Sequence, residues 1–306
     1  MNTPNVDLTT TVGSVELQNP IMTASGTAGY STELAGFFDL TTIGAVVTKS
    51  IAAYPWDGNP PPRLHPTPQG MINAVGLQGP GLEAWLRDHA PAMAATGATI
   101  VCSIWGRSVD DYRAAADLLA DAPPAVVAVE INLSCPNLEG RGGIFAHDVD
   151  LSAAVIAATA GCGRPRWAKL SPNTDRIVDV AGAVQAAGAE AVTLVNTLLG
   201  LVYDPATWKP ALGQGGGGLS GRAIHPVAVR AVHDVRQAHP ELPIVGVGGI
   251  ASGWDALEFL LAGANAVQVG TASFADPRAC PRVRDELAQI LAARGIHRVG
   301  DLDAVV

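Results

Sequence analysis

Eight short apolar runs recur along this chain of 306 residues, and they constrain its fold more than any other feature. Their apolarity is continuous rather than alternating, which is typical of strands buried on both faces of a parallel sheet. Ala/Leu-rich stretches separate most of these runs and predict helices. The predicted strands are Pro20–Ala24, Ala45–Thr48, Thr99–Ile104, Val126–Leu133, Arg166–Leu170, Ala191–Asn196, Pro243–Val247 and Ala266–Val269.

Eight strands, most of them followed by a helix, predict an α/β fold of the (β/α)8 TIM-barrel type. A doubly wound open sheet is the alternative, because a strand count from sequence can err by one or two. We expect one domain over residues 1–306, since no composition shift marks a second one. Helix boundaries are indicated by the capping pairs Ser108/Asp111 and Ser252/Asp255 and by the helix-ending glycines Gly188 and Gly263.

Two additions to a bare barrel are expected. Val6–Leu8 and Val12–Leu17 can pair as a small N-terminal β-hairpin that covers the barrel floor. The Pro-rich stretch Tyr54–Gly70 and the Gly-rich stretch Gly213–Gly221 are long for a compact domain. Long loops of this kind are often lids or binding segments, so we expect them over the C-terminal face of the barrel.

Composition excludes several classes of protein. The net charge is −9 and the 19 basic residues are scattered, which argues against nucleic-acid binding. No apolar run reaches the roughly 18 residues of a membrane span, and the N-terminus lacks the apolar core of a signal peptide. The four cysteines form no CxxC pair and no metal-ligand spacing. We expect a cytoplasmic protein with no metal, no disulfide framework and no iron–sulfur cluster of its own.

A cysteine follows the fourth predicted strand in the segment Asn132-Leu133-Ser134-Cys135-Pro136-Asn137. A lone cysteine is most often a small buried hydrophobe, which is how we interpret Cys102 within its strand. Cys135 differs because it lies past the strand end, between two amide residues. Its thiolate would be a competent base if nearby lysines lower its pKa, so we favour a catalytic role.

Glycines follow the seventh and eighth predicted strands. Gly248 and Gly249 come after one, and Gly270 with Thr271 after the other. Barrels commonly bind phosphate through backbone N–H groups of these two loops, which glycine lets the anion approach closely. One such loop alone would only turn a strand into a helix. Two on neighbouring strands predict a phosphate site.

Two lysines and several amides lie at strand ends or in the predicted lids. Lys49 ends the second strand and Lys169 lies in the fifth; buried lysines require an anionic partner, although Lys49 could instead extend to solvent. Amides in number suit recognition of an amide-rich ring. The polar set comprises Ser25, Asn73, Asn132, Asn137 and Asn196 followed by Thr197.

Together these segments resemble the class 1 dihydroorotate dehydrogenases, flavin enzymes of pyrimidine synthesis. The resemblance runs along nearly the whole chain, and so many ordered motifs are highly specific. It rests on Asn19–Met22, Ala24–Thr27, Val47–Ser50, Gly70–Leu77, Asn132–Asn137, Lys169–Asn173, Asn196–Gly200, Gly217–Gly221, Gly246–Ile250 and Gln268–Thr271.

The resemblance implies FMN at the barrel mouth and (S)-dihydroorotate, oxidised to orotate, stacked on it. Cys135 would remove the C5 proton while the C6 hydride passes to flavin N5, and Lys169 would stabilise reduced flavin near N1 and O2. The flavin residues implied are Ser25, Lys49, Ser50, Ser103, Asn132, Lys169, Val195 and Gly221, with the phosphate on Gly248, Gly249, Gly270 and Thr271. The substrate residues implied are Lys49, Asn73, Val75, Gly76, Leu77, Asn132, Asn137, Asn196 and Thr197.

Within the family the chain is most similar to the NAD-linked 1B form, on the segments Asn196–Gly200, Gly217–Gly221 and Ala279-Cys280-Pro281. That form implies a homodimer core and a separate subunit carrying FAD and an iron–sulfur cluster. Departures from the family pattern are Trp105 where a small residue is usual, Ser103 in place of an asparagine, and Arg222 and His225 where proline and lysine are frequent. These departures affect the contacts expected at the edge of the flavin and on the surface that meets the partner subunit.

Four other interpretations stay open. The first is a fumarate-linked 1A enzyme, and the second is a dihydropyrimidine dehydrogenase-like activity on a pyrimidine without a carboxylate. The third is a sugar-phosphate isomerase or lyase, which explains the glycine loops but neither Cys135 nor the asparagines. The fourth is a non-catalytic flavin-binding scaffold.

Overall fold

The computed structural model describes residues 6–134 and 145–302 and contains one eight-stranded parallel sheet. Its strands occur in the order β3-β14-β13-β10-β9-β8-β7-β4. Each of the eight apolar runs predicted from the sequence forms one of these strands. Their bounds are β3 Ile21–Thr23, β4 Val46–Val47, β7 Ile100–Ile104, β8 Val126–Asn132, β9 Arg166–Lys169, β10 Ala191–Leu194, β13 Ile244–Val247 and β14 Ala266–Val269.

The sheet closes on itself between β3 and β4, the two strands at the ends of this order. A parallel bridge pairs Met22 with Ala45. The backbone N–H of Thr23 also donates to the Ala45 carbonyl oxygen at 3.2 Å. A closed ring of parallel strands is a barrel, so the (β/α)8 prediction is confirmed and the open doubly wound sheet is excluded.

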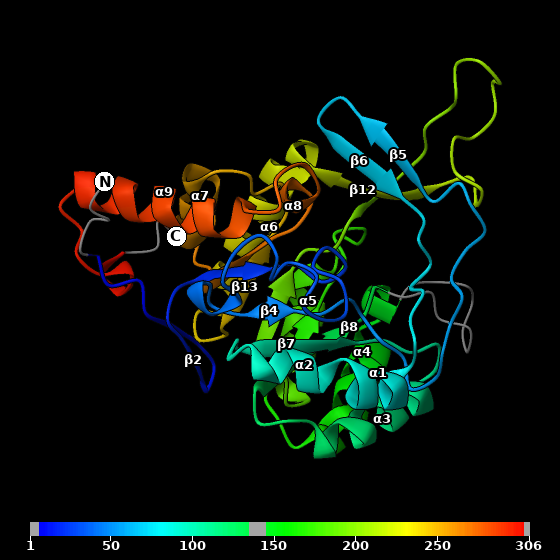
Figure 1. Ribbon diagram of the computed structural model, residues 1–306, viewed down its shortest axis with the longest axis horizontal. Helices are drawn as coiled ribbons and strands as arrows, with labels where there is room; N and C mark the ends of the chain where they lie inside the picture. Colours follow the sequence, from blue (N-terminus) through cyan, green and yellow to red (C-terminus); the bar gives the residue numbers. More distant parts are fainter. Residues whose placement is uncertain (1–5, 135–144, 303–306) are drawn as a thin grey trace.

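Helices follow most of the strands and surround the barrel (Figure 1). A single 3₁₀ turn, Leu40–Thr42, stands between β3 and β4 where a regular barrel would have an α-helix. The α-helices are α1 Leu82–Asp88, α2 Ala90–Ala95, α3 Val109–Leu118, α4 Val149–Ala158, α5 Ile177–Ala186, α6 His225–Ala238, α7 Gly253–Leu261, α8 Ala272–Ala275 and α9 Ala279–Ala293. Further 3₁₀ turns are Leu119–Asp121, Phe145–His147, Thr159–Cys162, Arg222–Ile224 and Val299–Asp301.

The helix boundaries predicted from single residues are confirmed. Ser108 caps α3 and Ser252 caps α7, each accepting the backbone N–H three residues further on, at 3.1 and 3.2 Å. Gly188 and Gly263 follow α5 and α7 with φ of +100° and +104°. Glycine adopts this left-handed conformation without a Cβ penalty, which lets the chain turn directly into the next strand.

A two-stranded hairpin of β1 (Thr10–Val12) and β2 (Val15–Leu17) closes the barrel floor. Val12, Val15 and Leu17 are buried in one apolar cluster with Trp167 of β9. Other members of this cluster come from β3, β4, β7, β8, β10, β13 and β14. The hairpin therefore covers the bottom of the barrel interior, as the sequence predicted.

The predicted partner strand Val6–Leu8 was wrong. Asp7 lies parallel to Arg298 instead, near the C-terminal end of the described chain. The hairpin turns at Gly13 and Ser14, and Val12 pairs directly with Val15. Because Gly13 has a φ of +60°, a tight two-residue turn forms there and the pairing segment must start immediately before it.

A second, four-stranded antiparallel sheet stands over one side of the barrel (Figure 1). Its order is β11 (Leu198–Gly200), β12 (Gly217–Gly221), β6 (Gly70–Asn73) and β5 (Leu64–Thr67). The sequence predicted irregular loops for Tyr54–Gly70 and Gly213–Gly221, which is wrong for the parts that form β5 and β12. β12 (Gly217–Gly221) is mostly glycine and lacks the alternation of polar and apolar residues by which strands are recognised, while β5 is only four residues long and contains a proline.

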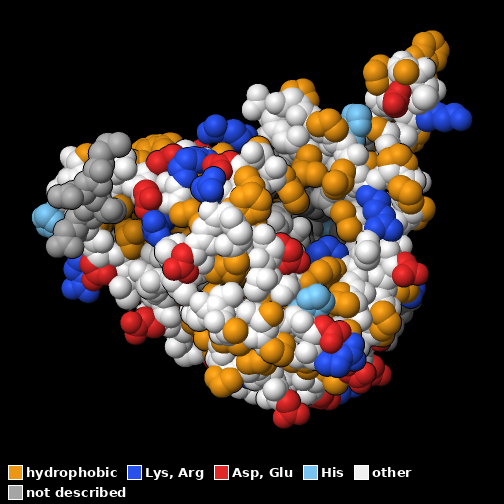
Figure 2. Space-filling model, viewed as in Figure 1, with side chains coloured by type: hydrophobic (Ala, Val, Ile, Leu, Met, Phe, Trp, Pro, Cys, Tyr) orange, Lys and Arg blue, Asp and Glu red, His pale blue; other side chains and the backbone are white. Residues whose placement is uncertain are grey.

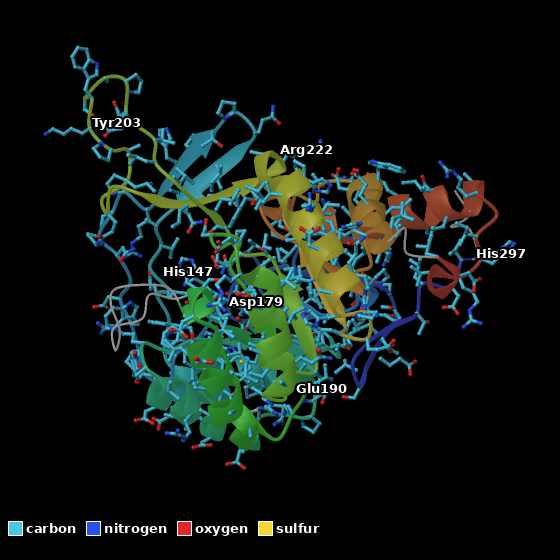
Figure 3. All side chains as sticks on the ribbon, turned by 180° about the vertical axis from the view of Figure 1, so that it is seen from behind. His147, Asp179, Glu190, Tyr203, Arg222 and His297 are labelled. Atoms are coloured by element: carbon cyan, nitrogen blue, oxygen red, sulfur yellow. The ribbon has the colours of Figure 1, made fainter. Side chains whose placement is uncertain are left out.

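Glycine in this sheet permits close packing. A Cβ at Gly218 would lie 2.1 Å from the Thr197 hydroxyl oxygen, and one at Gly70 would lie 1.9 Å from the Ser220 carbonyl oxygen. Between β11 and β12 the chain projects away from the barrel (Figures 1 and 2), and Tyr203 lies on this projection (Figure 3). Among the residues described, no helix is long and apolar enough to cross a bilayer.

Candidate functional site

A cavity of about 560 Å³ opens at the carboxyl ends of the barrel strands and extends under the antiparallel sheet. This is the end at which (β/α)8 barrels place their sites. The predicted site residues that line it are Ser25, Lys49, Ser50, Asn73, Val75, Gly76, Leu77, Asn132, Lys169, Val195, Asn196, Thr197, Gly221, Gly248, Gly249, Gly270 and Thr271.

Three of the predicted site residues are absent from this set of lining residues. Cys135 and Asn137 lie outside the described residues; Ser134, directly before them in the chain, lines the cavity. Ser103 is fully buried and is not among the lining residues. It instead contacts Ser50, which does line the cavity, with 2.9 Å between the two hydroxyl oxygens.

The barrel interior changes from apolar to polar along the strands. On β8, Ala128, Glu130 and Asn132 share one face because side chains alternate along a strand. Ala128 belongs to the floor cluster and Asn132 lines the cavity. Glu130 therefore lies in a layer between the floor and the cavity, and it is completely buried.

Glu130 forms an ion pair with Lys169, with 3.5 Å between Oε1 and Nζ. The Lys169 side chain is 5% exposed, so both charges are withdrawn from water. Glu130 is the anionic partner that burial of Lys169 requires, and it is not among the residues predicted from the sequence. The sequence does single out Glu130, because it is the only charged residue in the apolar run Val126–Ile131.

Hydroxyl and amide groups connect this pair to the cavity wall. The hydroxyl of Ser103 donates to Glu130 Oε1 at 3.3 Å. The amide nitrogen of Asn132 donates to the Ser50 hydroxyl at 3.1 Å, and the hydroxyls of Ser25 and Ser50 lie 3.0 Å apart. The amide of Asn196 donates to Asn132 Oδ1 at 3.2 Å. The network fixes the orientation of side chains from five strand ends.

Lys49 is the second lysine that lines the cavity. Its ammonium donates to the Tyr30 hydroxyl at 2.8 Å and to the Gln78 carbonyl oxygen. Burial, aided by the charge of Arg63, lowers the pKa of Lys49 to about 8. Burial together with Glu33 raises the pKa of Tyr30 to about 12, so this hydroxyl stays protonated. An anionic ligand here would meet a lysine that is charged below pH 8 and neutral above it.

The glycine loops after β13 and β14 form a narrow rim. Gly248 and Gly249 have φ of +148° and +73°. A Cβ would lie 2.5 Å from Ala228 Cβ at the first position and 2.8 Å from the Gly221 carbonyl oxygen at the second. Side chains are therefore excluded here, and the exposed backbone is suited to an anion such as phosphate.

Asn173 also lines the cavity, and its hydrogen bonds hold neighbouring residues in place. Its amide nitrogen donates to the Thr197 carbonyl oxygen at 3.0 Å, and its Oδ1 accepts the Leu199 N–H at 2.9 Å. These bonds fix the segment between β10 and β11. Asn173 belongs to the motif Lys169–Asn173 of the resemblance, but no role for it is predicted from the sequence.

The residues that depart from the family pattern have defined contacts. Trp105 is buried among Ala52, Tyr54, Trp56 and Leu77, beside the cavity rather than in it. Its bulk is therefore accommodated within a cluster of aromatic side chains. Three edge-on ring contacts, with centroids 6.1–6.4 Å apart, join Tyr54, Trp56 and Trp105.

Arg222 begins the 3₁₀ turn that precedes α6 (Figure 3), and His225 is the first residue of α6. The Arg222 guanidinium pairs with Asp255 at 3.3 Å. His225 Nδ1 lies 3.1 Å from the Gly248 carbonyl oxygen, and its Nε2 lies 3.1 Å from Glu258. A compact group is thus formed, in which the ring nitrogen of His225 and the carboxylate oxygens of Asp255 and Glu258 lie within 4.8 Å of one another. His225 also holds the Gly248 loop in place through its contact with the Gly248 carbonyl oxygen.

Fold and site together define a (β/α)8-barrel protein with a polar, amide-lined cavity, a buried lysine at its floor and a glycine rim suited to an anion. The family model for dihydroorotate dehydrogenase matches residues 7–291. The chain belongs to the dihydroorotate dehydrogenase family.

Similar proteins cover nearly the whole chain. Three of them carry the name dihydroorotate dehydrogenase B (NAD(+)), catalytic subunit. That of Trichlorobacter lovleyi is 45% identical, over 95% of each chain. That of Desulforudis audaxviator is 46% identical, over 95% of this chain and 94% of its own. That of Bacillus pumilus is 44% identical, over 93% and 92%.

Proposed function

We propose that this chain is the catalytic subunit of an NAD-linked dihydroorotate dehydrogenase that oxidises (S)-dihydroorotate to orotate. One observation carries the proposal beyond family membership: a buried lysine, Lys169, faces a cavity whose walls present the amides of Asn73, Asn132 and Asn196. A fixed positive charge at the cavity floor suits a flavin that becomes anionic on reduction. The amides suit a ring with several N–H and carbonyl groups.

Enzymes of this family are flavin-dependent, and we propose FMN as the flavin. The cavity of about 560 Å³ is within the range of small-molecule sites. The glycine rim, where a Cβ would clash, fits a phosphate, and Lys169 fits the pyrimidine side of the flavin. The proposed FMN residues are Ser25, Lys49, Ser50, Asn132, Lys169, Val195 and Gly221, with the phosphate on Gly248, Gly249, Gly270 and Thr271. Bound there, the flavin supplies a hydride acceptor.

We propose that the substrate lies between the flavin site and the antiparallel sheet. Lys49 and the Val75-Gly76-Leu77 turn would hold its carboxylate, since Lys49 is a cavity-lining cation beside this turn. Asn73, Asn132, Asn137, Asn196 and Thr197 would hold the ring. Ser103 would act from behind the wall, through its bond to Ser50.

We propose Cys135 as the base that removes the C5 proton. In the sequence it directly follows Ser134, which lines the cavity. Proton removal by a side chain on one face of the ring, with hydride loss on the other, avoids a free carbanion or cation. General bases of this kind typically contribute about 10²–10⁴-fold to a rate.

Replacing Cys135 tests the proposed base. Cys135→Ser should retain FMN and orotate binding yet lose about 10²–10⁴-fold in turnover near pH 7, recovering partly at high pH because a hydroxyl is a much weaker acid than a thiol. Stopped-flow measurement of flavin reduction by dihydroorotate reports the step. Cys162→Ala, at a buried cysteine outside the cavity, is the matched control and should keep its rate. Near-normal reduction by Cys135→Ser at pH 7 would exclude this thiol as the base.

The lowered pKa of Lys49 predicts a pH dependence of ligand binding. A carboxylate binds the charged lysine, which predominates below pH 8. The Kd of orotate should therefore be nearly constant from pH 6 to 7 and rise by up to about tenfold for a one-unit increase in pH above 8. Titration calorimetry measures this Kd, and Lys49→Gln should bind weakly at every pH in this range. A flat profile in the unsubstituted protein would contradict the role of Lys49.

Electron transfer to NAD should need a partner subunit. The relatives are named as NAD(+)-linked catalytic subunits, and the four cysteines of this chain are too dispersed for iron–sulfur ligation. The isolated protein should oxidise dihydroorotate with dyes or oxygen but hardly with NAD. NAD reduction should appear only when a subunit carrying FAD and an iron–sulfur cluster is added.

Two controls separate this assignment from its rivals. Brisk fumarate reduction by the isolated chain would indicate the 1A form, and robust NAD reduction by it alone would remove the need for a partner. A panel including dihydrouracil, which lacks the carboxylate, separates dihydroorotate oxidation from other pyrimidine dehydrogenase activities.

A further inference from the structure

Glu130 is a buried carboxylate that the chemistry above does not use. It is 0% exposed and lies one layer below the cavity, on the strand that carries Asn132 to the cavity wall. A carboxylate removed from water is costly unless charge and hydrogen bonds compensate it. Its presence at this point of an otherwise apolar strand therefore calls for a specific reason.

Four side chains from four other strands converge on this carboxylate. Oε1 receives the Ser103 hydroxyl at 3.3 Å and lies 3.5 Å from the Lys169 ammonium. Oε2 receives the Gln268 amide at 2.7 Å and the Thr193 hydroxyl at 3.2 Å. These donors stand on β7, β9, β14 and β10 respectively. Hydrogen bonds and the opposite charge of Lys169 thus compensate the removal of this carboxylate from water.

The Glu130 carboxylate is the acidic group that the described residues place against Lys169. Among the described residues that line the cavity, Lys49 and Lys169 carry the ionisable side chains, and both are cations. Glu130 pairs with Lys169, and the strand register places Asn132 of β8 and Thr193 of β10 beside it. Ser103 of β7 and Gln268 of β14 reach the same carboxylate. Only Glu130 among these titrates. A buried ammonium without an anion loses its proton rather than remaining charged.

We propose that Glu130 is a positioning residue that holds Lys169 protonated and fixed beneath the cofactor in both redox states. This inference rests on the proposed flavin site. Because Lys169 is already charged when the flavin is oxidised, reduction need not bring a proton to this lysine. Glu130 thereby sets how many protons accompany the two electrons, without touching the substrate or the reacting atoms.

The pH dependence of the flavin midpoint potential tests this role. In Glu130→Gln, with FMN bound, Lys169 should lose its proton in the oxidised state and regain it on reduction. One further proton per two electrons should steepen the slope by about 30 mV per pH unit within the pH 6–9 range, since a tenfold change corresponds to 29.6 mV for two electrons. Glu130→Asp, which keeps the charge, should retain the slope of the unsubstituted protein.

An unchanged slope in FMN-loaded Glu130→Gln would overturn the inference, and so would equal steepening in Glu130→Asp. If Glu130→Gln does not fold, thermal unfolding of two other variants gives the answer. Lys169→Met leaves Glu130 as an unpaired buried carboxylate, so adding Glu130→Gln to it should raise the Tm by several degrees. A lower Tm in the double variant would also overturn the pairing. Failure of the unsubstituted protein to bind FMN would instead contradict the proposed function and leave this stability comparison intact.

Discussion

The ion pair between Glu130 and Lys169 is the interaction on which the upper half of the barrel depends. Removing one partner of such a buried pair typically destabilises a protein by about 3–5 kcal/mol, because the other charge is left without compensation. Here the pair is placed where the apolar floor ends and the cavity begins. The barrel can therefore hold a positive charge under a ligand without exposing that charge to water.

Apolar groups lie on one side of the ion pair and polar groups on the other. Below it, the hairpin and Trp167 fill the barrel interior with apolar groups. Above it, Ser50 and Asn132 carry the hydrogen-bond network to the cavity wall. The antiparallel sheet then bounds the cavity, and its glycines allow strands and loops to approach closely. Gly218, for example, leaves room for the Thr197 side chain. A flat ligand with one anionic end would contact polar side chains at the cavity floor, amide side chains on its wall and the exposed backbone of the glycine loops at its rim.

Much of this arrangement was predictable from the sequence. Buried parallel strands have continuous apolar runs, so all eight barrel strands were found, and residues directly after strands necessarily gather at one end of a barrel. The antiparallel sheet was not found, because strands such as Gly217–Gly221 are defined by close backbone contacts rather than by side-chain periodicity. The hairpin partner was misassigned because Gly13 fixes a tighter turn than the apolar pattern alone indicated. Glu130 was missed because its partners come from strands distant in sequence, such as Gln268, 138 residues away.

The central claim is that this cavity binds FMN and that dihydroorotate reduces it there. Anaerobic titration of the purified protein with dihydroorotate, followed by visible absorbance, tests this claim most directly. We expect a yellow protein with one FMN per chain, whose flavin absorbance bleaches in proportion to the dihydroorotate added and with formation of an equal amount of orotate. A colourless protein that cannot be reconstituted with FMN, or a flavin that dihydroorotate leaves oxidised, would contradict it.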